Sequence, residues 1–217
     1  GTGVNITAGK ADGIITVNVN QSNLQVTDTK KLVNVANSTA GEVNINVNKS
    51  VDLLSGANLV NIGTIAGNVN VVLNADDQKV VDGSLVDVGA LAAGTATVNI
   101  NKNVDITGNG NIVKAGAMTA GHLNVNLNVE GVDGLTVKTG KTALDLSSVN
   151  ADNVASVKNT GTVTIAGTGK LVVGNNSNTI SLTNQGLITL KAVDTATPDS
   201  SSHISSGAAV NVANYGT

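Results

Sequence analysis

The chain contains no cysteine, phenylalanine or tryptophan, and it has one tyrosine and one proline. All 12 of its basic residues are lysine, so arginine is absent as well. The lack of cysteine excludes disulfide and thiol chemistry. With no arginine and a formal net charge of -3, the chain lacks both the planar cations and the basic field that favour nucleic-acid binding. Nucleic acid is therefore not expected as a partner.

Long hydrophobic runs are also missing. No apolar stretch approaches the roughly 18 to 20 residues of a membrane span, and the first residues show no signal-peptide pattern. We therefore expect no membrane-spanning segment in this chain. What the chain has instead is a high content of short aliphatic residues, including 33 valines. A core built from methyl-bearing side chains without aromatic anchors favours thin, regularly layered folds.

Internal repetition is the strongest pattern. An aliphatic segment recurs at spacings of 27, 26 and 27 residues, at 32–36, 59–63, 85–89 and 112–116. Between these copies lie stretches with asparagine at every second position, at 44–48, 68–71, 99–103 and 124–128, with 17–20 as a forerunner. A period of two predicts β-strands with aliphatic residues on one face and asparagine on the other.

A third apolar piece completes each unit, at residues 51–54, 80–82, 104–106 and 129–132. One unit of three short strands cannot enclose a core, but copies stacked about 4.8 Å apart would pair in register. We therefore predict an all-β parallel β-solenoid with three short strands and about 25 to 27 residues per coil. At that repeat, the chain would form about eight coils.

The repeat divides the chain into three parts. Residues 1–130 form the regular asparagine-rich coils, and residues 131–193 continue the solenoid with a drifted repeat, in which 134–140 echo 110–116 and 157–165 match 182–190. Residues 194–217 comprise a serine-rich loop that contains Pro198, followed by the start of a further coil. Because an uncovered last coil would expose unpaired strand edges, we expect more coils or a cap to follow.

The drifted repeat resembles a known group. The pattern Asn-x-Gly-x-Ile/Val at 159–165 and 184–190, flanked by alternating aliphatic residues, is similar to the passenger regions of bacterial autotransporters and filamentous-haemagglutinin-type exoproteins. The resemblance covers residues 13–193 and implies a right-handed parallel β-helix, exported to a Gram-negative cell surface through an outer-membrane barrel that this segment lacks. The asparagine alternation of the first half resembles a surface-layer or filament-forming protein instead. The resemblance transfers no functional residue.

The asparagine rows have a structural and a functional interpretation. Structurally, outward amides stacked at the strand repeat would hydrogen-bond from coil to coil. Functionally, they would offer a flat polar array to a glycan, to ice or to a neighbouring subunit. The inverse orientation would place the amides inside the core, at a cost of at least about 1 kcal/mol for each unpaired amide.

Catalytic residues are scarce. His122 and His203 are the only histidines, so a Ser-His-Asp arrangement would have to use one of them. His122 occupies a variable turn position and His203 lies in the serine-rich loop, and both are interpreted as solvated residues. We therefore expect no catalytic or cofactor-binding residue and no enzymatic activity. The alternative, a polysaccharide-active β-helix enzyme, would need a groove with acids, a base and calcium.

Candidate metal ligands are limited to Asp76 and Asp77, the only paired acids. Their carboxylates suit calcium, and Asp82 and Asp87 could approach them across the coil, but a solvated turn is the preferred interpretation. We therefore expect no metal and no cofactor, with calcium as the alternative. A further set of acids recurs about once per coil and could form a surface charge ladder with Lys49 and Lys102, at Asp52, Asp105 and Glu130.

Two functions follow from this architecture. The first is a non-enzymatic stalk or adhesin segment of an exported, extracellular protein on a bacterial cell surface. Its partners would be molecules on host or neighbouring cells. The second is a self-assembling filament or surface-layer subunit, whose partners would be copies of itself.

Overall fold

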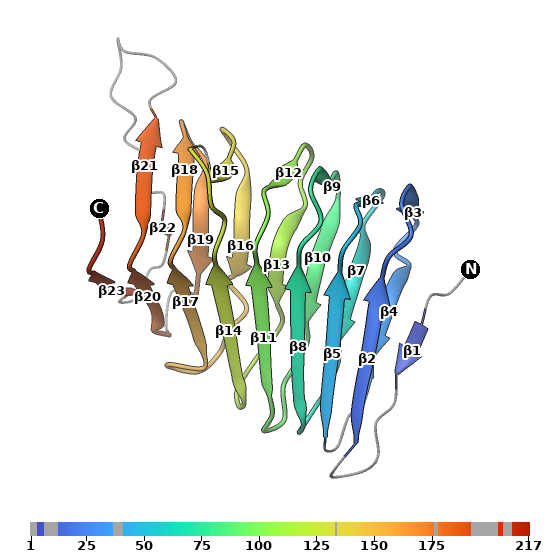
Figure 1. The fold of residues 1–217 in the computed structure, drawn as a ribbon. Coiled ribbons are helices and arrows are strands. Elements are labelled where there is room, and N and C mark those ends of the chain that lie inside the picture. The colour runs from blue at the N-terminus through green and yellow to red at the C-terminus, as the bar shows by residue number, and fades with distance from the viewer. Residues whose placement is uncertain are drawn as a thin grey trace.

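The computed structural model describes residues 4–6, 13–36, 41–132, 134–175, 178–191, 204–205 and 210–217. All regular secondary structure in these ranges is β-strand, and every pair of neighbouring strands is parallel. Successive strands pass from one sheet to the next, so the chain winds as a parallel β-solenoid (Figure 1). The predicted fold class is confirmed. Its right-handed sense stays a prediction.

Two long sheets run the length of the solenoid (Figure 1). Sheet A contains β1 (Val4–Ile6), β4 (Lys31–Val35), β7 (Ala57–Ile62), β10 (Gly83–Val88), β13 (Asn111–Ala115), β16 (Thr142–Leu146), β19 (Lys170–Gly174) and β22 (Ile204–Ser205). Sheet B contains β2 (Ile14–Val19), β5 (Glu42–Val47), β8 (Asn68–Leu73), β11 (Thr95–Ile100), β14 (His122–Leu127), β17 (Ala155–Asn159), β20 (Ile180–Asn184) and β23 (Val210–Asn214).

The third face of the solenoid is divided. Sheet C contains β3 (Leu24–Val26), β6 (Val51–Leu53), β9 (Gln78–Val80) and β12 (Val104–Ile106). Sheet D contains β15 (Leu135–Val137), β18 (Thr162–Ala166) and β21 (Leu187–Lys191). No ladder joins β12 to β15 in the described part of the chain, whereas sheets A and B continue past this point.

The strand register is the one that the repeat predicts. In sheet A, Val60 pairs with Val33 on one side and with Val86 on the other, at the expected spacings. In sheet B, Val98 pairs with Val71 and Val125. These side chains are at most 1 % exposed and form continuous aliphatic columns through the core. Burying one such side chain contributes about 2 kcal/mol, so the columns hold the coils together without aromatic residues.

Close stacking also explains the recurring Ala-Gly pairs. Gly94 follows Ala93 at the turn before β11, and a Cβ at Gly94 would overlap the backbone carbonyl oxygen of Gly67 in the preceding coil. Gly121 occupies the same place one coil later and has a φ of 70°, which side-chain-bearing residues rarely adopt. Glycine therefore recurs here because each turn lies directly on the turn before it.

The strand assignment around residue 130 is wrong. Residues 129–132 were expected to form the third strand of their coil, but they form no strand, and Val132 is 95 % exposed. That strand is β15 instead, although 134–140 were expected to repeat 110–116 of sheet A. Sheet A continues with β16. The shift arises because extra residues enter this coil: Leu123 pairs with Ala155, 32 positions later.

The Asn-x-Gly corners place asparagine inside the solenoid. Asn159 and Asn184 are 0 % and 3 % exposed. The Nδ2 of Asn159 donates to Oδ1 of Asn184, and the Nδ2 of Asn184 donates to Oδ1 of Asn214, both at 2.8 Å. The hydrogen bonds of this inner amide ladder offset the free-energy cost of desolvating the buried amides. At its upper end, Oδ1 of Asn159 has no hydrogen-bond partner, because the residue paired with Asn159 in the preceding coil is Leu127.

The unpartnered Oδ1 of Asn159 leads to a testable prediction. Replacing Leu127 with asparagine would place an amide donor above Oδ1 of Asn159 and extend the ladder by one coil. A double-mutant cycle of Leu127→Asn and Asn159→Leu, measured by urea unfolding, should show a favourable coupling of about 1 kcal/mol. A coupling of zero would show that this Oδ1 does not face Leu127.

Candidate functional site

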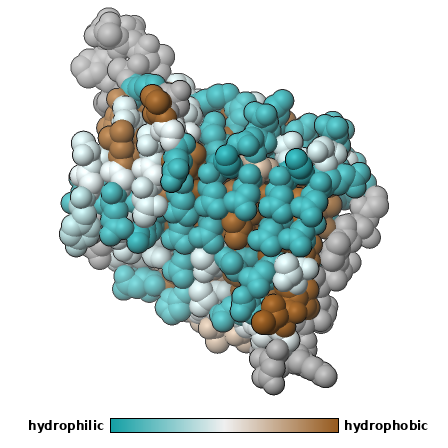
Figure 2. Space-filling view, in the orientation of Figure 1, coloured by the Kyte–Doolittle hydropathy of each residue, from teal (hydrophilic) through white to brown (hydrophobic). Residues whose placement is uncertain are grey.

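The outer face of sheet B carries the asparagine rows. Figure 2 shows hydrophilic side chains across the front of this sheet. The side-chain amide of one coil donates from Nδ2 to the Oδ1 of an earlier coil in the pairs Asn46–Asn18 (2.9 Å), Asn70–Asn44 (3.4 Å), Asn99–Asn70 (2.9 Å), Asn101–Asn74 (2.7 Å), Asn126–Asn99 (2.9 Å) and Asn128–Asn101 (3.1 Å). The predicted outward orientation and the predicted amide ladders are both confirmed for these rows.

The third face of the solenoid is interrupted between β12 and β15. Equivalent positions are 25 to 29 residues apart in most coils, but Val113 pairs with Leu144, which is 31 residues later, and Val172 pairs with Ile204, which is 32 residues later. On the third face, the backbone N–H of Thr136 in β15 donates to the Oδ1 of Asn103 (3.0 Å) instead of to a carbonyl of β12. One surface hollow lies beyond the C-terminal end of β15, beside the turn before β16, and a second lies between β15 and the start of β12.

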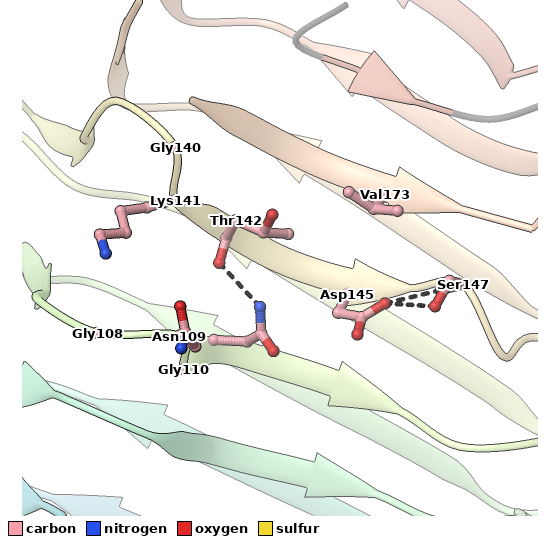
Figure 3. Close-up of a pocket in the computed structure, with 10 residues that line it drawn as sticks. Gly108, Asn109, Gly110, Gly140, Lys141, Thr142, Asp145, Ser147 and Val173 are labelled. Carbon is pink, nitrogen blue, oxygen red and sulfur yellow. Dashed lines mark hydrogen bonds between the residues drawn. The ribbon is translucent and has the colours of Figure 1, made fainter. Parts of the chain in front are cut away.

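The first hollow lies between the turn before β13 and the turn before β16, and it has a volume of about 350 Å³ (Figure 3). We call it the Ser147 hollow. Its lining combines glycine, amide, hydroxyl and charged groups: Gly108, Asn109, Gly110, Asn111, Gly140, Lys141, Thr142, Asp145, Ser147 and Val173. Its lining is therefore mainly polar, with Val173 as the aliphatic residue.

Hydrogen bonds fix the side chains of the Ser147 hollow. Oγ of Ser147 donates to Oδ1 of Asp145 (2.6 Å), and the backbone N–H of Ser147 donates to the same oxygen (3.1 Å). Nδ2 of Asn111 donates to the backbone carbonyl of Thr142 (3.0 Å) and so bridges the two strands (Figure 3). The side chains of Asn111, Asp145 and Ser147 are thus held in place.

The second hollow has a volume of about 400 Å³ and contains more acid. Lys138 contacts Oδ1 of Asp105, and Lys102 contacts Oδ1 of Asp76 at 3.2 Å. Its lining residues are Asp76, Asp77, Gln78, Asn103, Val104, Asp105, Thr136 and Lys138. Both ion pairs are solvent-accessible, so each contributes at most about 1 kcal/mol.

Within the described residues, no ion pair joins Lys49 or Lys102 to Asp52, Asp105 or Glu130, and sheet C places a different lysine beside two of these acids. Asp52 pairs in register with Lys79, and Lys79 pairs with Asp105. Lys102, one of the two predicted partners, instead contacts Asp76. Glu130 lies exposed in the interrupted coil and joins no strand. The prediction was wrong because it placed the lysines by sequence proximity, whereas parallel pairing selects the residue one coil away.

The predicted calcium ligands are not brought together with a third ligand. Asp76 lies beside Lys102, while Asp82 accepts a hydrogen bond from the backbone N–H of Asn109 (3.3 Å). Asp87 accepts one from the side chain of Asn58 (2.9 Å). Across the ranges that the structure describes, no three histidine or acidic residues are grouped as metal ligands would be. Calcium at Asp76 and Asp77 stays the untested alternative to the expectation of no metal.

His122 lines neither hollow. His122 is exposed and pairs in register with Thr95, as predicted, but it is the first residue of strand β14 and does not lie in a turn. His203, together with Pro198 and most of the serine-rich loop, lies outside the described residues. The residues of the Ser147 hollow were not predicted. The available signal was the spacing between repeat copies on either side of residue 130, which is longer than one regular coil.

Comparisons of the chain with protein-family models, curated proteins and solved structures give no match. The resemblance to autotransporter and filamentous-haemagglutinin passengers therefore rests on sequence motifs, while the solenoid rests on the structure. No helix in the described ranges has the length and hydropathy needed to cross a membrane.

Proposed function

We propose that this chain is a non-enzymatic structural segment, of the stalk or adhesin type, of an exported bacterial cell-surface protein. The observation that carries the proposal is the continuity of sheets A and B, each of which runs through eight strands without a break. A stack of this kind grows in length by about 4.8 Å for each coil while its cross-section stays constant. A rod of this kind would hold a binding segment at a fixed distance from the cell surface.

The surface chemistry supports this role. Amide ladders cover the outer face of sheet B and join successive coils by side chain as well as by backbone. An uncharged, hydrogen-bonded face of this kind keeps its contacts when the ionic strength changes, because it does not depend on ion pairs. An extracellular location is proposed from the resemblance of the Asn-x-Gly corners to exported passengers.

A second function, a self-assembling filament or surface-layer subunit, is favoured by one feature. Leu187 and Leu190 on β21, the last strand of sheet D, are 40 % and 60 % exposed. An apolar strand at the edge of a sheet can pair with another copy of the chain. In that case the partner would be a second copy of the chain.

Sedimentation velocity separates these functions. We expect the purified chain to sediment as one elongated monomer across an about hundredfold range of concentration, with no shift toward larger species. The variant Leu190→Lys, which places a charge on the edge strand, should sediment identically. Ordered assemblies that grow with concentration and disappear in this variant would contradict the stalk proposal and favour the filament.

The proposed location has its own test. A membrane-impermeant reagent that modifies lysine should label this protein on intact cells of the bacterium that produces it, because exposed lysines such as Lys114 and Lys158 lie on its surface. A cytoplasmic protein in the same cells serves as the control. Labelling of the chain only after cell lysis would refute a cell-surface location.

A further inference from the structure

The Ser147 hollow lies beside the interruption of the third face, where no ladder joins β12 to β15 in the described part of the chain. In solenoid proteins, insertions that interrupt the repeat map to one face, and that face is often the one that binds a partner. The hollow lies between the turn at Gly108–Gly110 and the turn at Gly140, both of which line it (Figure 3). Its volume is at the lower end of the range for small-molecule sites.

The lining matches a ligand rich in hydroxyl groups. A hydroxyl donates one hydrogen bond and accepts up to two, so it needs donors and acceptors side by side. Figure 3 shows Asn109 and Lys141 at one end of the hollow, and Asp145 and Ser147 at the other. The amides supply both donors and acceptors, Lys141 supplies donors, and Asp145 supplies acceptors.

Charge selects among hydroxyl-rich ligands. The Ser147 hollow contains one ammonium group and one carboxylate, at Lys141 and Asp145, so its formal charge is balanced. A polyanion would gain attraction at one end of the hollow and meet repulsion at the other. The neighbouring hollow adds Asp76, Asp77 and Asp105, which disfavours polyanions further. An uncharged ligand has no such conflict.

We propose that the Ser147 hollow binds a segment of an uncharged oligosaccharide. Lys141 and Asn109 hold hydroxyl groups at one end, and the Asp145–Ser147 pair holds them at the other. Affinity is modest, because no aromatic side chain lines the hollow to stack on a sugar ring. The inference goes beyond the structural role above and does not depend on it, since a rod of any location could carry this site.

Saturation-transfer NMR with the whole chain tests the site. The probes are neutral tetrasaccharides of glucose, N-acetylglucosamine, galactose and mannose, with tetragalacturonate as the charged comparison, each at about 5 mM, which detects weak binding. At least one neutral probe should receive saturation, and tetragalacturonate should receive less. No transfer to any neutral probe, or stronger transfer to tetragalacturonate, would overturn the proposal.

Two adjacent serines provide a matched pair of variants. Ser147 and Ser148 are both exposed, but only Ser147 lines the hollow. Ser147→Leu should weaken binding of the neutral probe about tenfold, because it removes a hydroxyl and fills the hollow, whereas Ser148→Leu should change it less than about twofold. Circular dichroism of both variants serves as the control for folding. Equal effects of the two variants would place the binding elsewhere.

A third variant covers the alternative surface. Asn99→Ala removes an amide from the outer face of sheet B and leaves the Ser147 hollow intact. Binding should survive in this variant. Loss of binding in Asn99→Ala with retention in Ser147→Leu would assign the sugar to the asparagine rows and refute the proposed site.

Discussion

Replacing Val86 with aspartate is expected to unfold several neighbouring coils. Val86 is fully buried, and its backbone pairs with that of Val60 on one side and Val113 on the other. A carboxylate there would face only aliphatic side chains, and a buried charge without a partner costs about 3 to 5 kcal/mol. Since each coil is stabilised by its neighbours, the loss spreads along the stack. Urea unfolding followed by circular dichroism measures it.

The matched control is Lys102→Asp, which introduces the same side chain on the surface. The side chain of Lys102 is 47 % exposed, and its ion pair with Asp76 is its only charged contact in the described part of the chain. The loss of an exposed ion pair costs at most about 1 kcal/mol. If Lys102→Asp were as destabilising as Val86→Asp, the assignment of inner and outer positions would be wrong.

Removing one whole coil should leave the solenoid intact. Deletion of residues 60–85 joins Leu59 to Val86, which then takes the place of Val60 in sheet A. The deletion also removes Lys79 and would place Asp52 beside Asp105, so it is combined with Asp52→Asn. We expect the melting temperature to fall by only a few degrees and the rod to shorten by about 4.8 Å in small-angle X-ray scattering.

Removing half a coil should abolish the fold. Deletion of residues 60–72 is shorter, yet it moves Gln78 into the position of the buried Ile65 and puts every later strand out of register. The loss of cooperative thermal unfolding, seen by circular dichroism, is the expected result. If this variant were more stable than the whole-coil deletion, the repeat would not set the structure.

The strands of sheet B and their register were predictable because the same property sets both. In a parallel stack, each side chain lies on its equivalent one coil away, so an aliphatic or an asparagine at one position favours the same residue at the next. Val98, between Val71 and Val125, is an example. The alternation of aliphatic and polar residues predicted the strands, and the spacing between repeat copies predicted which strands pair.

The interrupted coil could not be predicted, because this agreement between repeat copies is missing there. Between Leu127 and Leu135 no copy of the repeat fixes the path of the chain, and an apolar residue such as Val129 is compatible with a strand or with a loop. The inward turn of Asn159 was missed because an amide is normally an outer residue. It is stable inside because Asn184 and the carbonyl of Gly161 accept its hydrogen bonds.

The central claim is that the chain forms a parallel stack with one coil for each repeat. Because the chain has no cysteine, single cysteines can be introduced in pairs and spin-labelled. Thr16, Asn124, Ser156 and Ser181 belong to one outer column of sheet B. With one label on Thr16→Cys, pulsed electron paramagnetic resonance should give distances of about 19, 24 and 29 Å to labels at the other three sites. Distances that do not increase by one strand spacing per coil would contradict the stack.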